Sequence, residues 1–345
     1  MRATELVHAH RGPDASGTPP TDSGVRLRAG IVSLAAGIAI LAVKFAGYLV
    51  TGSTAVLSDA MESIVNVVAA LFSLASVVFA SRPADESHPY GHGKIEFLSG
   101  GFEGGLIAFA ALVIAYQALE ALWLGTTVHS IHYGVVLIVA AGGANALLGL
   151  YLLRTGRRVH SPALEADGLH VLTDFWTSAG VIVALLLVWA TGWQFLDPLI
   201  ALVLGVQLAF VGAKLLRRSV GGLLDESDPD LLSRLAAALN EARSPGVIAA
   251  HRLRAIRSGG VVNIDAHLVV PRFWTVAQGH DAARRFEEDV IRRVEQDARF
   301  VFHVDPCRPV YCERCTVEPC PVRARPFRAA PDLSLHELTS EPPPD

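Results

Sequence analysis

Six apolar segments, each about as long as a lipid bilayer is thick, dominate the N-terminal part of this sequence. They lie at roughly 29–50, 56–80, 99–123, 132–153, 168–191 and 197–216. A membrane-spanning helix needs about 20 predominantly apolar residues. Its backbone N–H and C=O groups must pair with one another, because the lipid core offers them no partners. The chain of 345 residues is 51% hydrophobic and only 18% charged, which excludes an ordinary soluble protein. We therefore expect an all-α six-helix transmembrane domain.

Basic residues mark one side of the predicted membrane. The connections 51–55, 124–131 and 192–196 contain no Lys or Arg. The opposite ends of the spans carry Arg26, Arg28, Arg82, Lys94, Arg154, Arg157, Arg158, Lys214, Arg217 and Arg218. The positive-inside rule then predicts that both termini are cytoplasmic. The frequent Ala, Arg and Gly are typical of a bacterium, so we expect a multi-pass protein of the cell membrane, the bacterial inner membrane.

The charge pattern divides the chain into four expected parts. These are a disordered cytoplasmic tail (1–26), a transport domain (27–220), a cytoplasmic α+β domain (221–310), and a Cys-containing and then disordered tail (311–345). In the third part, PDLLSRLAAALNEA predicts an amphipathic helix, and HRLRAIRSGGVVNIDAHLVVP predicts two strands around a Gly-Gly turn. A second helix over 276–297 and a strand at RFVFHVDP complete the pattern. This order suits a ferredoxin-like fold.

Two of the spans carry polar residues at matching positions. The second contains Asp59, Glu62 and Asn66, and the fifth contains Asp167, His170 and Asp174. Spacings of three and four place each set on one helix face, although an ionised group at mid-membrane costs roughly 2.5 to 3.5 kcal/mol. A bound divalent cation such as Zn(II), Fe(II), Co(II) or Mn(II) would offset that cost. The alternative is polar contact between helices, and we interpret Lys44 and Glu103 as structural or snorkelling residues.

Two further groups of candidate ligands lie outside the spans. The loop RPADESHPYGHGKIEF brings Asp85, His88 and His92 close in sequence, which indicates either a facial metal site or a solvated loop. The second group is four cysteines within fourteen residues, Cys307, Cys312, Cys315 and Cys320. They are a possible thiolate site for zinc or a soft metal, and the alternative is a reduced tail without a ligand.

The stretches TGSTAVLSDAMES, HPYGHGKIE, ADGLHVLTD, LLDESDPD and HVDP together resemble the cation diffusion facilitator family over about 27–310. The resemblance implies a homodimer with six spans per protomer, a cytoplasmic metal-binding domain, and exchange of a divalent metal for protons. It implies a transport site at Glu62, Asn66, His170 and Asp174, and a loop site at Asp85, His88 and His92. It also implies a cytoplasmic site at His251, His267, His280, His303 and Asp305, and a coupling salt bridge between Lys94 and Asp225.

This sequence departs from the family pattern at the transport site, because a carboxylate usually stands where Asn66 is and Asp or His where Glu62 is. The departure bears on metal preference and on the number of protons exchanged. We predict proton-coupled efflux of Zn(II) or Fe(II), with Mn(II), Co(II), Ni(II) and Cd(II) left open. The metal is both substrate and regulator, and no organic cofactor is expected. Metal binding to carboxylate and neutral imidazole displaces protons, and His170 is the natural coupling group.

Two other functions remain as alternatives. Asn66 favours a non-transporting membrane metal sensor or regulatory subunit. A membrane-embedded metalloenzyme is disfavoured, because the sequence has no H-E-x-x-H motif and a site with only protein ligands leaves no position for activated water. The expected partners are the lipid bilayer, a second copy of the chain, metal ions and protons. No basic stripe suggests nucleic acid.

Overall fold

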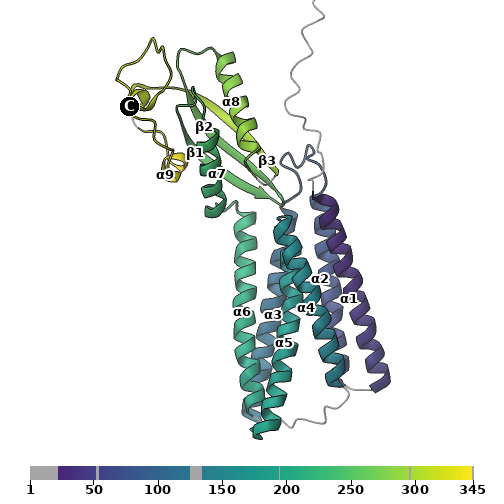
Figure 1. Ribbon diagram of the computed structural model, residues 1–345. Coiled ribbons are helices and arrows are strands. Elements are labelled where there is room, and N and C mark those ends of the chain that lie inside the picture. Colours follow the sequence, from purple (N-terminus) through teal and green to yellow (C-terminus); the bar gives the residue numbers. More distant parts are fainter. Residues whose placement is uncertain (1–21, 52–53, 125–133, 194, 295–296, 344–345) are drawn as a thin grey trace, which may run out of the picture. The chain divides into compact units, whose positions relative to one another are not determined.

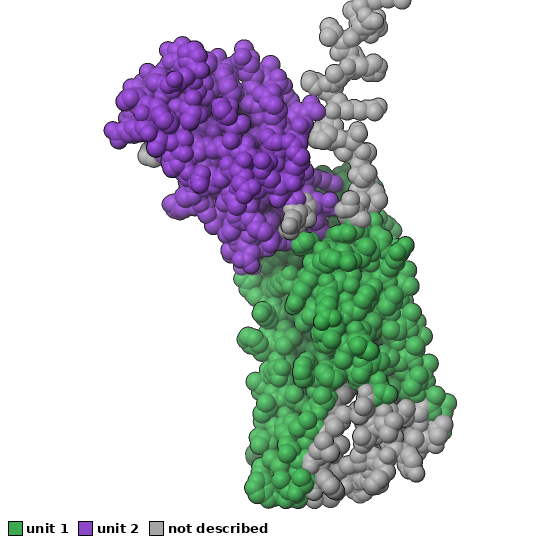
Figure 2. Space-filling view, viewed as in Figure 1, with its two compact units in different colours: residues 1–223 green, residues 224–345 purple. Residues whose placement is uncertain are grey.

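The computed structural model describes residues 22–51, 54–124, 134–193, 195–294 and 297–343 (Figure 1). The chain divides into two compact units, residues 1–223 and residues 224–345 (Figure 2). Each unit has its own hydrophobic core, and we describe each by itself. Of the N-terminal segment predicted to be disordered, residues 1–21 lie outside the described part of the chain, and a helix has already begun at Ser23.

The described residues of the first unit form six long helices that run lengthwise beside one another (Figure 1). They are α1 (Ser23–Thr51), α2 (Thr54–Ala80), α3 (Ile95–Leu124), α4 (Gly134–Arg158), α5 (Pro162–Thr191) and α6 (Leu196–Leu223). Over the described residues, three contain stretches long and apolar enough to cross a membrane, namely Ser23–Ala46, Ile95–Glu120 and Pro198–Leu223. The described part of α2 contributes a shorter apolar segment, Asn66–Ala80. The predicted helical transmembrane domain is therefore confirmed.

Glycines allow close contacts between helices in this unit. A Cβ atom on Gly212 of α6 would lie 2.7 Å from the backbone nitrogen of Ala108 in α3. A Cβ atom on Gly168 of α5 would lie 2.6 Å from the backbone nitrogen of Leu153 in α4. Because lipid tails are as apolar as the helices themselves, membrane helices associate largely through such close backbone packing. The Gly168 contact fixes α4 against α5 at a position two residues before His170 of the candidate transport site.

The second unit is an α+β domain with a three-stranded sheet in the order β1-β2-β3. Its elements are α7 (Pro229–Ala242), β1 (Ala249–Ser258), β2 (Val261–Val270), α8 (Val276–Ile291) and β3 (Asp297–Pro306). Strands β1 and β2 form the predicted antiparallel hairpin, whose turn has Gly259 at a positive φ of 62°. Strand β3 returns through α8 to lie parallel to β2. A complete ferredoxin-like fold has a further strand before its first helix. The described residues of this unit form no such strand, and the parallel strands β2 and β3 therefore pair directly.

Hydrophobic packing and helix capping explain the soluble unit. Leu235 and Leu239 of α7, Leu268 of β2 and Phe286 of α8 are almost fully buried in one core. The carboxylate of Asp228 caps α7 and accepts hydrogen bonds from the backbone nitrogens of its first turn at 3.0 and 3.2 Å. Such a cap typically contributes about 1 kcal/mol. The amphipathic pattern and the cap act together to place α7.

The C-terminal segment contradicts the prediction of a disordered tail. After β3 the chain forms a 3-10 helix (Pro309–Arg314) and the short helix α9 (Leu335–Thr339), and the structure describes it as far as residue 343. Leu333 and Leu338 are buried in the core of the second unit. The Asn240 side chain donates to the backbone oxygen of Leu333 at 2.9 Å and accepts from its nitrogen at 2.7 Å. Burial of two leucines and these specific hydrogen bonds outweigh the Pro- and Arg-rich composition.

Candidate metal sites

Three of the four residues predicted for the transport site meet between α2 and α5. Nε2 of His170 lies 3.0 Å from Oδ1 of Asn66, and Nδ2 of the same amide donates a hydrogen bond to Asp174. The side chains of Glu62 and Asp59, also on α2, lie outside the described residues. The single amide of Asn66 thus bridges the two ionisable groups of α5, which lie one helical turn apart.

Asp167, one turn before His170, is held by a different helix. It is 1% exposed and accepts a hydrogen bond of 2.6 Å from the Ser33 hydroxyl of α1. A cavity of about 20 Å³ lies between these residues and Asn66, and Asn145 of α4 also lines it. Of the stripe predicted on α5, Asp167 therefore faces this small cavity, which is lined by residues of α1, α2, α4 and α5.

Two acidic residues of α3, Glu103 and Glu96, are fully buried in this unit. Glu103 of α3 is fully buried, and neither of its carboxylate oxygens has a hydrogen-bond partner among the described residues. Glu103 therefore does not snorkel to the membrane surface, as the sequence reading allowed. Glu96, also fully buried, lies 3.4 Å from the guanidinium of Arg26. For Glu103 the sequence signal was an isolated acidic residue in an apolar run, whereas Glu96 lies just before the predicted span and gave no such signal.

The structure brings together the three residues predicted for the loop site. One carboxylate oxygen of Asp85 lies 3.2 Å from Nδ1 of His88, and the other lies 3.3 Å from Nε2 of His92. The backbone N–H of His88 donates to Asp85 at 2.7 Å and lowers the pKa of that carboxyl group, with smaller effects from the two imidazoles. Gly91, at a φ of 85°, allows the turn that brings His92 back towards Asp85.

Three histidines lie at one register across the sheet of the second unit. His251 of β1 pairs with His267 of β2, which in turn pairs with His303 of β3. Asp305 is two residues beyond His303 and therefore on the same sheet face. Its carboxylate lies 3.2 Å from His251, 2.9 Å from His267 and 3.3 Å from His303. Burial lowers the pKa of His251, which favours the neutral imidazole that binds metal.

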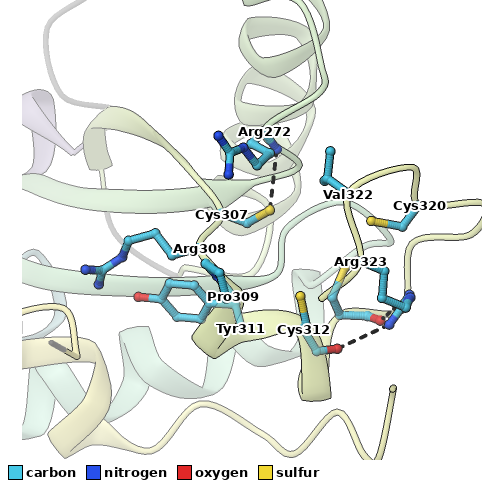
Figure 3. Close-up of a pocket in the computed structure, with 10 residues that line it drawn as sticks. Arg272, Cys307, Arg308, Pro309, Tyr311, Cys312, Cys320, Val322 and Arg323 are labelled. Carbon is cyan, nitrogen blue, oxygen red and sulfur yellow. Dashed lines mark hydrogen bonds between the residues drawn. The ribbon is translucent and has the colours of Figure 1, made fainter. Parts of the chain in front are cut away.

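Some predicted site residues are not brought into these clusters. His280 is exposed on α8 and does not belong to the group formed by His251, His267 and Asp305, whose ligand atoms lie within 4.8 Å of one another. Lys94 belongs to the first unit and Asp225 to the second, and their salt bridge stays a prediction. The four cysteines all line a single pocket in the second unit (Figure 3).

Comparison with known proteins identifies the class of protein to which this architecture belongs. Residues 30–224 match the family model of the cation efflux transmembrane domain, and residues 228–307 match that of the cytoplasmic domain of cation efflux proteins. The chain therefore belongs to the cation diffusion facilitator family, as the sequence resemblance predicted. Members of this family are transporters and not enzymes.

Curated relatives agree with this assignment over most of their length. An uncharacterised transporter of Synechocystis is 38% identical over 277 residues, which are 80% of this chain and 89% of the relative. The cation-efflux pump FieF of Serratia proteamaculans is 31% identical over 283 residues, or 82% of this chain and 93% of the pump. FieF of Salmonella arizonae is 30% identical over 284 residues, with the same two coverages.

Proposed function

We propose that this protein exports a divalent transition metal, Zn(II) or Fe(II), from the cytoplasm in exchange for protons. The observation that carries the proposal is the network of His170, Asn66 and Asp174 between α2 and α5. It places an imidazole nitrogen, an amide oxygen and a carboxylate together inside a bundle of apolar helices. This mixture of nitrogen and oxygen donors suits borderline divalent metals.

The chemistry of these donors supports coupling to protons. A metal ion binds the ionised carboxylate of Asp174 and the neutral imidazole of His170, so metal binding displaces protons and protonation displaces metal. His170 is the residue best suited to exchange a proton, since an ordinary histidine titrates near pH 6.5. A proton that returns inward through a potential of 100 mV releases about 2.3 kcal/mol, which is available to drive export.

The two other clusters fit supporting roles in this scheme. The basic residues at the ends of the helices favour a cytoplasmic position for the loop that contains Asp85, His88 and His92, where it would collect metal before transport. The sheet site at His251, His267, His303 and Asp305 serves as a sensor of cytoplasmic metal. His280, which lies outside this cluster, stays a predicted ligand. The match of residues 228–307 to the cytoplasmic domain of the family supports a homodimer, in which Lys94 and Asp225 couple the two units.

Metal uptake into proteoliposomes under an imposed pH gradient tests the proposal. Zn(II), Fe(II), Mn(II) and Co(II) are compared, and the gradient is collapsed in a parallel sample. Asp174→Asn removes the charge without a change in volume and should abolish uptake. The matched control is Glu120→Gln, the same substitution at an exposed carboxylate near the end of α3, which should transport normally.

The outcomes separate transport from sensing. Uptake that requires both the pH gradient and Asp174 supports the exchanger, and the order of the metals identifies the substrate. If folded wild-type protein in sealed liposomes moves none of the metals, the proposal is wrong. Asn66 would then mark a site that has lost transport, and the chain would be a metal-sensing membrane protein.

A further inference from the structure

The segment that follows the last strand carries four thiols into a common pocket. The family model of the cytoplasmic domain ends at residue 307, so Cys312, Cys315 and Cys320 lie beyond the matched residues. Cys307 follows β3, Cys312 lies in the 3-10 helix, Cys315 terminates it, and Cys320 lies in the next loop. All four are free cysteines, and Cys312 and Cys315 are buried.

The pocket has the size and lining expected of a site for one metal ion. Its cavity of about 20 Å³ is lined by all four cysteines, and neither a histidine nor a carboxylate is among the lining residues. A water molecule needs roughly 10 to 15 Å³, so the cavity accommodates one small ion and excludes a cluster of several iron and sulfide ions. In Figure 3, the labelled side chains of Cys307, Cys312 and Cys320 surround this space from different segments of the chain.

Backbone groups position two of the sulfur atoms. The N–H of Arg272, between β2 and α8, donates to Sγ of Cys307 at 3.4 Å. The N–H of Ala324 donates to Sγ of Cys312, also at 3.4 Å. Hydrogen bonds of this kind orient metal ligands and stabilise thiolate charge. The two N–H donors come from distant parts of the sequence. Their hydrogen bonds would hold the pocket together before any ion binds.

Arginines supply the positive charge that a thiolate site requires. The guanidinium of Arg323 donates to the backbone oxygens of Cys312 and Cys315, both at 3.2 Å. Arg272 and Arg308 also line the pocket. Four thiolates around a dication carry a net charge of two negatives, and guanidinium groups nearby offset it.

We propose that Cys307, Cys312, Cys315 and Cys320 bind one divalent cation of the zinc type, which fastens the C-terminal segment to the sheet domain. Four sulfur ligands are typical of structural zinc sites. In the loop site and the sheet site, three ligand atoms lie within 4.8 Å of one another, whereas no three of these four thiols lie that close together. We therefore expect the segment from Cys307 to Cys320 to tighten around the ion as it binds. The site is separate from the transport site and does not depend on transport.

Cobalt(II) provides a test in the full-length, reduced protein in detergent. Cobalt bound to thiolates shows an intense sulfur-to-metal charge-transfer absorption, which histidine and carboxylate sites lack. We expect this absorption to rise to one equivalent per chain and to disappear when one equivalent of zinc is added. Cys312→Ser should abolish it or reduce it several-fold. The control variant His267→Ala, which alters the sheet site, should leave it unchanged.

A second measurement does not depend on the folding of a variant. In wild-type protein, zinc should slow the reaction of all four thiols with a chromogenic disulfide reagent by at least tenfold, and a chelator should restore the rate. The proposal is overturned if no charge-transfer absorption forms in reduced protein, or if zinc leaves the thiol reactivity unchanged. It is also overturned if the purified chain contains disulfides between these cysteines that persist in a cytosol-like thiol buffer.

Discussion

Replacement of Asn66 by Asp should raise the number of protons exchanged for each metal ion. In the structure, the amide oxygen of Asn66 is 3.0 Å from Nε2 of His170, and its nitrogen donates to Asp174. The substitution keeps the size of the side chain, but it exchanges the amide donor for a second negative charge beside Asp174. Two ionised carboxylates in this position repel each other, so the metal-free site must take up a proton.

The size of the effect follows from these contacts. Two unit charges about 4 Å apart interact by about 4 kcal/mol at an effective dielectric constant of 20. Since about 1.4 kcal/mol corresponds to a tenfold change in binding, that repulsion favours retention of a proton by roughly a thousandfold. A bound dication removes the repulsion and expels the proton. We therefore expect Asn66→Asp to release up to one more proton per metal ion bound than the wild type.

Calorimetric titration in buffers of different ionisation enthalpy measures this proton release directly. Transport in proteoliposomes should in turn depend more steeply on the imposed pH gradient. The matched control is Asn145→Asp, because Asn145 lines the same cavity and receives the same substitution on a different helix. It should change the proton release much less. If Asn66→Asp binds metal with unchanged proton release, Asn66 is not part of the metal site and the reasoning fails.

Three further substitutions test the fold. Asp228→Ala removes the α7 cap and an ion pair with β1, and should cost about 1 to 2 kcal/mol, seen as faster hydrogen exchange in α7 of the full chain. Burial raises the pKa of Asp228, but its hydrogen bonds and the ion pair with Arg257 outweigh burial, so that the folded-state pKa is lowered. The stabilisation from Asp228 is therefore present above about pH 4 and is lost as the pH falls through the lower folded-state pKa. Gly246→Ala places a side chain at a φ of 108°, with its Cβ 2.2 Å from the ring of Trp274. The resulting strain should lower the melting temperature of the second unit. An unchanged melting temperature would show that the substitution causes no strain. Gly168→Leu should separate α5 from Leu153 of α4 and lower both thermal stability in detergent and metal flux; normal flux would show that this contact is not needed.

Most of the fold could be predicted because local patterns determine it. Apolar runs of bilayer length predict the helices of the first unit, and the Gly-Gly turn between two alternating segments predicts the β1–β2 hairpin. The C-terminal segment could not be predicted in the same way. Its composition is that of a disordered chain, yet it is held in place by Leu333 and Leu338, by the paired hydrogen bonds to Asn240, and by ion pairs such as that between Arg314 and Glu337. Contacts between residues so distant in sequence leave no periodic signal.

The candidate sites were predictable as sets of residues but not as networks. Spacings of three and four identified the stripe on α5, because such residues must share a helix face. The sequence did not reveal that Ser33 of α1 donates to Asp167, or that one amide joins His170 to Asp174. Serine and asparagine are common residues, and their role arises only from the packing of α1 and α2 against α5. The register that aligns three histidines across the sheet was equally hidden, since it depends on strand pairing.

The hydrogen bonds of α5 bear on how the candidate transport site stays stable when it holds no metal. A carrier that trades metal for protons must also be stable without metal, although each ionisable group at membrane depth costs several kcal/mol when it lacks a partner. In this structure, Asp167 is satisfied by Ser33, while Asn66 contacts both His170 and Asp174. Because Asn66 is neutral and both donates and accepts, it stabilises these groups without a competing charge. A carboxylate at that position would bind metal more strongly, but it would need a proton of its own whenever the site is empty.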